Sequence, residues 1–383
     1  MEIQQKIAES LVMAFSMFWD VLWPLILGFT LSAIVQAVVS HKALAKTLGG
    51  NSVKNITFAS LFGIASSSCS YAAIALSRSL FQKGASFTSA MVFEIASTNL
   101  VIELGLILFV LMGWEFALAE WLGGIIMVIF IALIFRFTLT KKLVSLAKEN
   151  ASKDLQGKME GHAAMDMSIT GEKFFWAKLL SKDGITAVSH FFVMEWASLW
   201  IDIVIGFVVA GVLTVFVPQS FWQAFFFTDN PTASFILGPL LGPLIAILSF
   251  VCSVGNVPLA VVLWNGGISF GGVVSFIFAD LIVLPILDIY RKYYGWKVTT
   301  YIFFTFYVTM ALAGYVIEIL FQVFHLIPVH RSILVFEQGI SLNYTSYLNI
   351  IFIVIAFILG WRFLKSGGPE MLKMMNQKDH MHH

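Results

Sequence analysis

The two cysteines of the chain each stand next to a serine in the middle of an apolar stretch. Cys69 lies within SSSCS at 66–70, and Cys252 lies within VCSVGN at 251–256. A thiolate selects soft metals and metalloids, whereas hydroxyl and amide groups can satisfy backbone atoms that are freed where a helix breaks. The pattern therefore predicts a substrate site for a small and thiophilic solute, formed by Ser68, Cys69, Ser70, Cys252, Ser253 and Asn256.

The same residues admit other interpretations. Small side chains permit close helix packing, and a buried cysteine often behaves as a small hydrophobic residue. A reversible disulfide between Cys69 and Cys252 is a further alternative, although disulfide geometry is strict. The recurrence of Cys-Ser at two places argues against simple helix packing and leaves the binding-site and inert-cysteine interpretations equally weighted.

Carboxylates form the second group of candidates, because ionisable side chains inside apolar segments are costly and usually functional. The candidates are Asp20, Glu94, Glu103, Glu195, Asp202, Asp280, Asp288 and Glu318. Glu94, Asp202 and Asp280 are expected to couple transport to protons or a cation, and Asp20 is expected to face a cavity. Asp288 and Glu318 stand near segment ends and are expected at the membrane interface. The alternative is that buried carboxyl groups form paired structural contacts only.

The elements that position these residues follow from the composition. The 383-residue chain is 59% hydrophobic and 12% charged, with a mean hydropathy of +0.88, whereas soluble domains are about 25% charged. A helix needs about 20 apolar residues to cross a membrane, so an all-α polytopic membrane protein is expected. Its predicted membrane segments are 11–40, 56–77, 86–111, 116–137, 187–217, 235–264, 269–287, 298–324 and 346–364.

Positive charges predict how these segments are oriented. Lys and Arg crowd into the region 136–182 and the C-terminal end, but they are absent from the turns 112–115, 218–234 and 265–268. The central loop and the C-terminus are therefore expected in the cytoplasm. Positive residues flank 56–77 on both sides, and neither flank of 235–264 carries one. Each of these two segments is expected to be re-entrant, with its Cys-Ser motif at the tip.

The two halves of the chain resemble each other. A shift of 183 residues places Cys69 on Cys252, Ser70 on Ser253, Gly84 on Gly267, Ser86 on Ser269 and Phe87 on Phe270 without a gap. Three crossings in each half make the repeats inverted, and in such folds broken helices form a site near the membrane midplane. The expected organisation is a first membrane repeat at 1–137, a cytoplasmic lysine-rich loop at 138–186, a second repeat at 187–324, an extracellular loop with an extra C-terminal helix at 325–364 and a cytoplasmic tail at 365–383.

Two longer stretches carry a family resemblance. FVCSVGNVPLAVVLWNGGISFGGVVSFIFADLIVLPILDIYRKYYG at 250–295 and CSYAAIALSRSLFQKGAS at 69–86 resemble the YraQ/ArsP-like permease family. The resemblance covers most of the chain outside the central loop and the tail. It implies a polytopic inner-membrane permease, and some relatives export trivalent methylated or aromatic arsenicals.

The chain departs from the family pattern at its first cysteine. The matching residues are Cys69 and Ser70, followed by Arg78, Lys83, Gly84, Ala85 and Ser86. Relatives often carry Cys-Ser-Cys-Gly with a proline shortly after, whereas this chain has Ser70, Tyr71 and Ala73 in that stretch. The chain therefore has one thiol fewer and is closer to the YraQ-like branch, whose substrates the resemblance does not define.

The leading expectation is a permease or exporter that works by alternating access, without enzymatic activity and without a cofactor. No GxxxxGK[ST] phosphate-binding motif occurs, which excludes ATP-driven transport within this chain. The expected partners are the lipid bilayer and a small-molecule or ion substrate, with no nucleic acid, and a homo-oligomer is compatible with the sequence. Two alternatives remain: a membrane-embedded thiol redox protein that uses the Cys69/Cys252 pair, and a passive channel.

Overall fold

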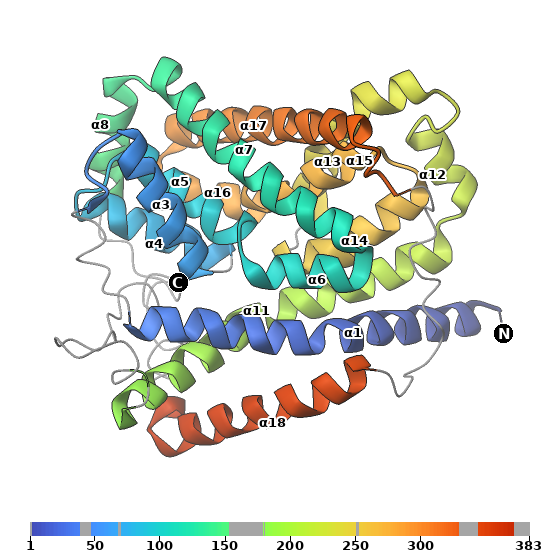
Figure 1. Ribbon diagram of the computed structural model, residues 1–383, viewed down its shortest axis with the longest axis horizontal. Coiled ribbons are helices and arrows are strands. Elements are labelled where there is room, and N and C mark those ends of the chain that lie inside the picture. The colour runs from blue at the N-terminus through green and yellow to red at the C-terminus, as the bar shows by residue number, and fades with distance from the viewer. Residues whose placement is uncertain are drawn as a thin grey trace.

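The computed structural model describes residues 2–38, 47–67, 70–152, 179, 181–249, 253–328 and 344–370, and these form helices and connecting turns without a strand. Figure 1 shows the helices in chain order. They are α1 (Glu2–Val38), α3 (Val53–Ser66), α4 (Ser70–Gln82), α5 (Phe87–Asn99), α6 (Ile102–Met112), α7 (Trp114–Thr138), α8 (Lys141–Ala151), α11 (Lys182–Phe216), α12 (Gln219–Phe225), α13 (Pro231–Ser249), α14 (Ser253–Gly266), α15 (Phe270–Phe278), the 3₁₀ helix η1 (Ala279–Ile282), α16 (Leu284–Tyr294), α17 (Trp296–Val323) and α18 (Tyr344–Lys365).

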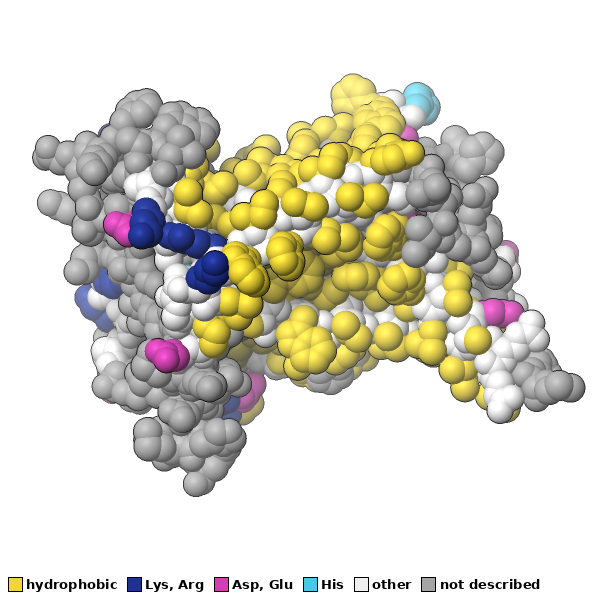
Figure 2. Space-filling view, turned by 90° about the horizontal axis from the view of Figure 1, so that it is seen from below, with side chains coloured by type: hydrophobic (Ala, Val, Ile, Leu, Met, Phe, Trp, Pro, Cys, Tyr) yellow, Lys and Arg dark blue, Asp and Glu magenta, His cyan; other side chains and the backbone are white. Residues whose placement is uncertain are grey.

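The surface identifies a multi-pass membrane protein. Within the described ranges, seven helices are long and apolar enough to cross a membrane. On α7 the exposed apolar side chains recur at every fourth position, at Trp121, Ile125, Ile129, Leu133 and Phe137, and residues four apart lie on one face of a helix. Figure 2 shows apolar side chains covering the middle of the molecule, with Lys and Arg side chains gathered at one end. These apolar faces are the surfaces that lipid covers.

Two of the predicted spans are interrupted. The predicted span 86–111 consists of α5 and α6, which are separated at Leu100 and Val101. The predicted span 269–287 is a bent pair, in which Phe270–Ile282 and Leu284–Tyr294 meet at 40°. Each interruption frees backbone groups that need polar partners inside a membrane.

The element bounds follow the 183-residue offset that separates the two halves. Moved back by that offset, α14 covers 70–83, α15 with η1 covers 87–99, and α16 covers 101–111. These ranges match α4, α5 and α6 to within one residue at each end. The same succession of helices and breaks therefore occurs twice.

Local chemistry explains why the breaks recur at matching places. Gly84 and Gly267 have φ angles of +114° and +105°, a backbone conformation that glycine adopts without strain. Two residues later, Ser86 and Ser269 cap α5 and α15, because each side-chain oxygen accepts a hydrogen bond from the backbone N–H three residues on. The GxS pattern thus ends one helix and starts the next in both halves.

The long helices α1, α11 and α18 form one layer, and the remaining helices form a second layer above it in Figure 1. The predicted C-terminal helix 346–364 is α18, and Asn349 attaches it to α1. The Asn349 side chain donates to the carbonyl of Trp19 at 2.7 Å and accepts from the N–H of Trp23 at 2.9 Å. It therefore bridges a helical turn next to Pro24, where a hydrogen bond of the helix is missing.

Glycine permits a close approach of α3 and α5, and this contact gives a first prediction. A Cβ atom on Gly63 would lie 2.5 Å from the carbonyl oxygen of Phe93 and 2.7 Å from Cβ of Ala96. Gly63→Val is expected to force α3 away from α5 and to cost about 3 kcal/mol of stability, as overpacking of a tight contact does. The thermal transition of the detergent-purified protein measures the effect. Gly360→Val is the control, because nothing lies within 4 Å of a Cβ atom there, and equal transitions for both variants would contradict the prediction.

Candidate functional site

The two predicted tips meet at one carboxylate. Ser70 Oγ donates to Asp280 Oδ2 at 2.6 Å, and Ser253 Oγ donates to the same oxygen at 2.7 Å. The two hydroxyl oxygens lie 3.0 Å apart. Of the site residues predicted from sequence, Ser70, Ser253 and Asp280 are therefore in direct contact, although 183 residues separate the two serines.

The backbone places these serines where a carboxylate is favoured. Ser70 is the first residue of α4, and Ser253 is the first residue of α14. The N-terminus of a helix carries partial positive charge and free N–H groups, which favour an anionic group. In Figure 1, α3 and α4 lie towards the left of the second layer, and α13 and α14 lie towards the right. Two helix N-termini from opposite ends thus converge on Asp280.

Asn99 links this contact to the break in the first half. It is the last residue of α5, and its Nδ2 donates to Asp280 Oδ1 at 3.4 Å. Ser70, Asn99 and Asp280 are each 0% exposed, and Ser253 is 7% exposed. The four polar side chains, called here the Asp280 cluster, are therefore shielded from solvent.

Asn256 is the remaining predicted residue that the structure describes at the second tip. Asn256 Oδ1 accepts a hydrogen bond from Ser249 Oγ at 3.1 Å, so the end of α13 is joined to the first turn of α14. Its Nδ2 has no hydrogen-bond partner among the described residues. Ser68, Cys69 and Cys252 lie outside the described residues.

The predicted coupling residue Glu94 occupies a separate buried position. It accepts a hydrogen bond from Ser77 Oγ of α4 at 2.5 Å and another from the hydroxyl of Tyr290 of α16. It therefore ties elements of the two halves together. Asp202 lies on α11, but its side chain is not among the described ones.

A second polar cluster lies at the end of α3. Glu195 Oε1 accepts from Gln36 Nε2 at 2.6 Å and lies 2.6 Å from Ser32 Oγ, which is itself 3.1 Å from the carbonyl oxygen of Ser66. These residues, called here the Glu195 cluster, are buried between α1, α11 and α3. Ser66 contacts the Glu195 cluster and Ser70 belongs to the Asp280 cluster, so the two clusters adjoin opposite ends of the stretch 66–70.

Other sequence candidates lie away from the tips. Arg78 is buried near the far end of α4, where it donates to the carbonyl of Ala151 at 2.9 Å and stacks on Tyr293. Asp288 is 44% exposed and forms ion pairs of 2.6 Å with Arg291 and 3.0 Å with Lys292.

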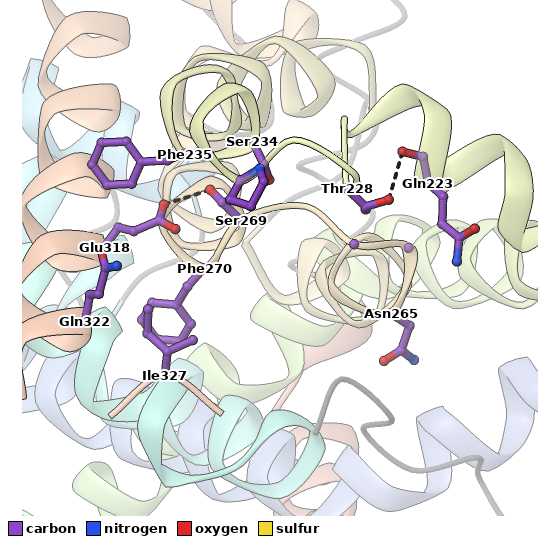
Figure 3. A pocket seen from close by; sticks show the side chains of 13 residues that line it. Gln223, Thr228, Ser234, Phe235, Asn265, Ser269, Phe270, Glu318, Gln322 and Ile327 are labelled. Carbon is purple, nitrogen blue, oxygen red and sulfur yellow. Dashed lines mark hydrogen bonds between the residues drawn. The ribbon is translucent and has the colours of Figure 1, made fainter. Parts of the chain in front are cut away.

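Figure 3 shows a pocket of about 520 Å³ at the other end of α14. Its wall includes Asn265, Phe270 and Glu318, and the Glu318 carboxylate accepts from Ser269 Oγ at 2.7 Å and from the N–H of Gly271 at 3.0 Å. Since the 14 residues of α14 rise about 1.5 Å each, the pocket lies about 20 Å from Ser253. It is separate from the Asp280 cluster.

Sequence reasoning missed two buried groups, one of them inside the Asp280 cluster. Asn99 stands five residues after Glu94 in the apolar segment, but its bond to Asp280 at the end of α5 was not predicted. Glu120 was not among the candidates, although it stands inside the predicted segment 116–137 and is 1% exposed. The criterion that selected Glu94, a carboxyl group within an apolar run, would have found Glu120.

Comparisons with known proteins agree with this architecture. The ArsP_1 family, described as a predicted permease, matches residues 6–319. The chain is 54% identical over 338 residues to the protein named "Putative permease Rv2963" of Mycobacterium tuberculosis, which covers 88% of this chain and 83% of the relative. No solved structure matches the chain. A transporter rather than an enzyme is indicated, and the chain belongs to the ArsP_1 family of predicted permeases.

Proposed function

We propose that the protein is a secondary permease whose solute site lies at the tips that precede α4 and α14. The observation that carries this proposal is the contact of Ser70 and Ser253, one from each half, with the same oxygen of Asp280. Broken helices that converge from two repeats are the usual way in which transporters build a central site. The chain neighbours of the two serines are Cys69 and Cys252, so the solute we propose is small and thiophilic.

The surroundings of the tips favour a neutral or cationic solute. Asp280 already occupies the positive ends of α4 and α14, so an anion would compete with a buried carboxylate there. Glu195 Oε1 lies near the end of α3 that precedes the first tip, 2.6 Å from Ser32 Oγ, which contacts Ser66. These two carboxylates attract positive charge and repel negative charge.

Alternating access and orientation are parts of the same proposal. The repeated succession of helices and the approach of the two hairpins from opposite ends support inverted repeats with re-entrant tips (Figure 1). We place the protein in the cell membrane. The Lys and Arg side chains gathered at one end support an orientation with the central loop and the C-terminus in the cytoplasm (Figure 2). Glu94, Asp202 and Asp280 are the groups we propose for ion coupling.

Growth of a deletion strain on a panel of thiophilic compounds tests the function. We expect the deletion to change tolerance to at least one of phenylarsine oxide, arsenite and Cd²⁺ by about tenfold, because each of these compounds binds thiols. The wild-type gene should restore tolerance, and Cys69→Ala or Cys252→Ala should not, at equal amounts of protein in the membrane. Unchanged tolerance to the whole panel would contradict a thiophilic solute, and full restoration by both variants would contradict a thiol site.

A further inference from the structure

Glu120 is a carboxyl group that no part of the proposed solute site uses. It lies on α7 and is 1% exposed, and neither of its carboxyl oxygens has a hydrogen-bond partner among the described residues. An ionised carboxylate without a partner is very costly in an apolar interior, where a group either neutralises or acquires a counter-charge. Glu120 therefore needs a proton or a cation.

The break between α5 and α6 lies directly against this part of α7. The carbonyl oxygen of Asn99 is 2.6 Å from the position that a Cβ atom on Gly124 would take, and Gly124 stands one helical turn after Glu120. Trp121 Nε1 donates to the carbonyl of Val101 at 3.5 Å. Residues 120–124 of α7 thus pack on the non-helical residues that follow Asn99, where carbonyl groups lack helical donors.

The same break leads to the Asp280 cluster. Asn99 points its Nδ2 at Asp280, and its Oδ1 has no hydrogen-bond partner among the described residues. Asp280 is also within electrostatic reach of Glu120. Two carboxyl groups that interact in a low-dielectric interior disfavour simultaneous ionisation, because like charges raise the energy of the doubly charged state.

The other charged groups of the elements that pack on α7 are engaged elsewhere. Glu94 of α5 accepts from Ser77, Glu318 of α17 accepts from Ser269, and the Glu103 side chain of α6 lies against Gly28 of α1. The remaining charge on α17 is Lys297, in its first turn. Helix α15 carries no charged residue, and η1 contributes Asp280.

We propose that Glu120 is a proton-binding site, which stays un-ionised while Asp280 accepts the hydroxyls of the two tips. The site is the carboxyl of Glu120, and the break in the first half, where Asn99 Oδ1 also lacks a hydrogen-bond partner among the described residues, packs on the same part of α7. A proton on Glu120 removes a repulsion from Asp280, the residue that holds the tips together. The use of this proton in coupling rests on the proposed permease function. The protonation itself does not depend on any solute.

Infrared spectroscopy of the full chain in lipid vesicles tests the site without a substrate. At pH 7 the wild-type protein should give a carbonyl band of un-ionised carboxylic acid, and Glu120→Gln should lose the intensity of one such group. Glu120→Asp should keep the band, and Glu115→Gln is the matched control at the start of the same helix, with the wild-type spectrum expected. The backbone amide band shows that each variant is folded.

Three results would overturn the proposal. They are an unchanged acid band in Glu120→Gln, an equal loss in Glu115→Gln, and a band that disappears when choline chloride is replaced by sodium chloride, which would identify a sodium site instead. A Glu120 band with the expected behaviour, in a protein that alters tolerance to none of the thiophilic compounds, would support the proton site and contradict the thiophilic permease. The two failures are therefore distinguishable.

Discussion

Asp280→Ala is expected to break the contact between the two halves and to lower the free energy of unfolding by about 3–6 kcal/mol. The substitution removes the acceptor of Ser70, Ser253 and Asn99, all of them buried. Each buried donor that is left without a partner costs about 1–3 kcal/mol. The effect should be among the largest of any single substitution, since most cost about 1 kcal/mol.

Asp280→Asn separates the structural role of this residue from its chemical role. The amide keeps the shape and one acceptor oxygen, so we expect a folded protein with a smaller loss of stability. If Asp280 carries charge during transport, the same variant should lose transport of whichever thiophilic compound the wild-type protein handles. The thermal transition of the purified protein and tolerance of the complemented strain measure the two effects independently.

Asp288→Ala is the matched control for Asp280→Ala. Asp288 is the same residue type on the neighbouring helix α16, but it is 44% exposed and its ion pairs with Arg291 and Lys292 are at the surface. Surface ion pairs contribute about 0–1 kcal/mol. Equal stability losses in Asp280→Ala and Asp288→Ala would mean that the Asp280 cluster does not hold the halves together.

Much of this arrangement is predictable from sequence because it rests on short-range chemistry. Apolar runs give the positions of the long helices, since a membrane requires about 20 such residues for each crossing. Glycine and serine at 84 and 86, repeated at 267 and 269, mark the same turn and helix cap twice. The offset of 183 residues pairs Ser70 with Ser253, and the structure places these two side chains in contact.

The partners of the carboxylates could not be predicted in the same way. Hydropathy measures composition along the chain and does not reveal which side chains face each other, so the bond from Asn99 to Asp280 across 181 residues had no local signal. The break at Leu100 and Val101 was missed because both residues are apolar and continue the run. The Glu195 cluster depends on how α1 packs against α11, which is a tertiary property.

Ser70→Cys combined with Ser253→Cys is expected to form a cross-link between the halves almost completely. The two oxygens that the sulfur atoms would replace lie 3.0 Å apart, and both side chains start from helix N-termini that face the same carboxylate. A cross-link there should hold the two tips together, and reduction should release them. Cys69→Ala and Cys252→Ala are included in the background, so that the introduced thiols are the only ones present.

Ser77→Cys combined with Ser253→Cys is the control pair. Ser77 lies on the same helix as Ser70, and seven residues of helix correspond to about 10 Å. Ser77 is also buried, and its hydroxyl bonds to Glu94 instead of Asp280. This pair should stay reduced under oxidant concentrations that cross-link the first pair.

Cross-linking of Ser70→Cys with Ser253→Cys in native membranes therefore tests most directly whether the two halves meet at Asp280. A protease site placed between residues 153 and 178 divides the chain into its halves after oxidation with copper phenanthroline. We predict that the fragments of this double variant stay joined on a non-reducing gel and separate after reduction, while those of the Ser77→Cys pair separate in both conditions. Fragments of the first pair that separate without reduction would contradict a shared site at the two tips.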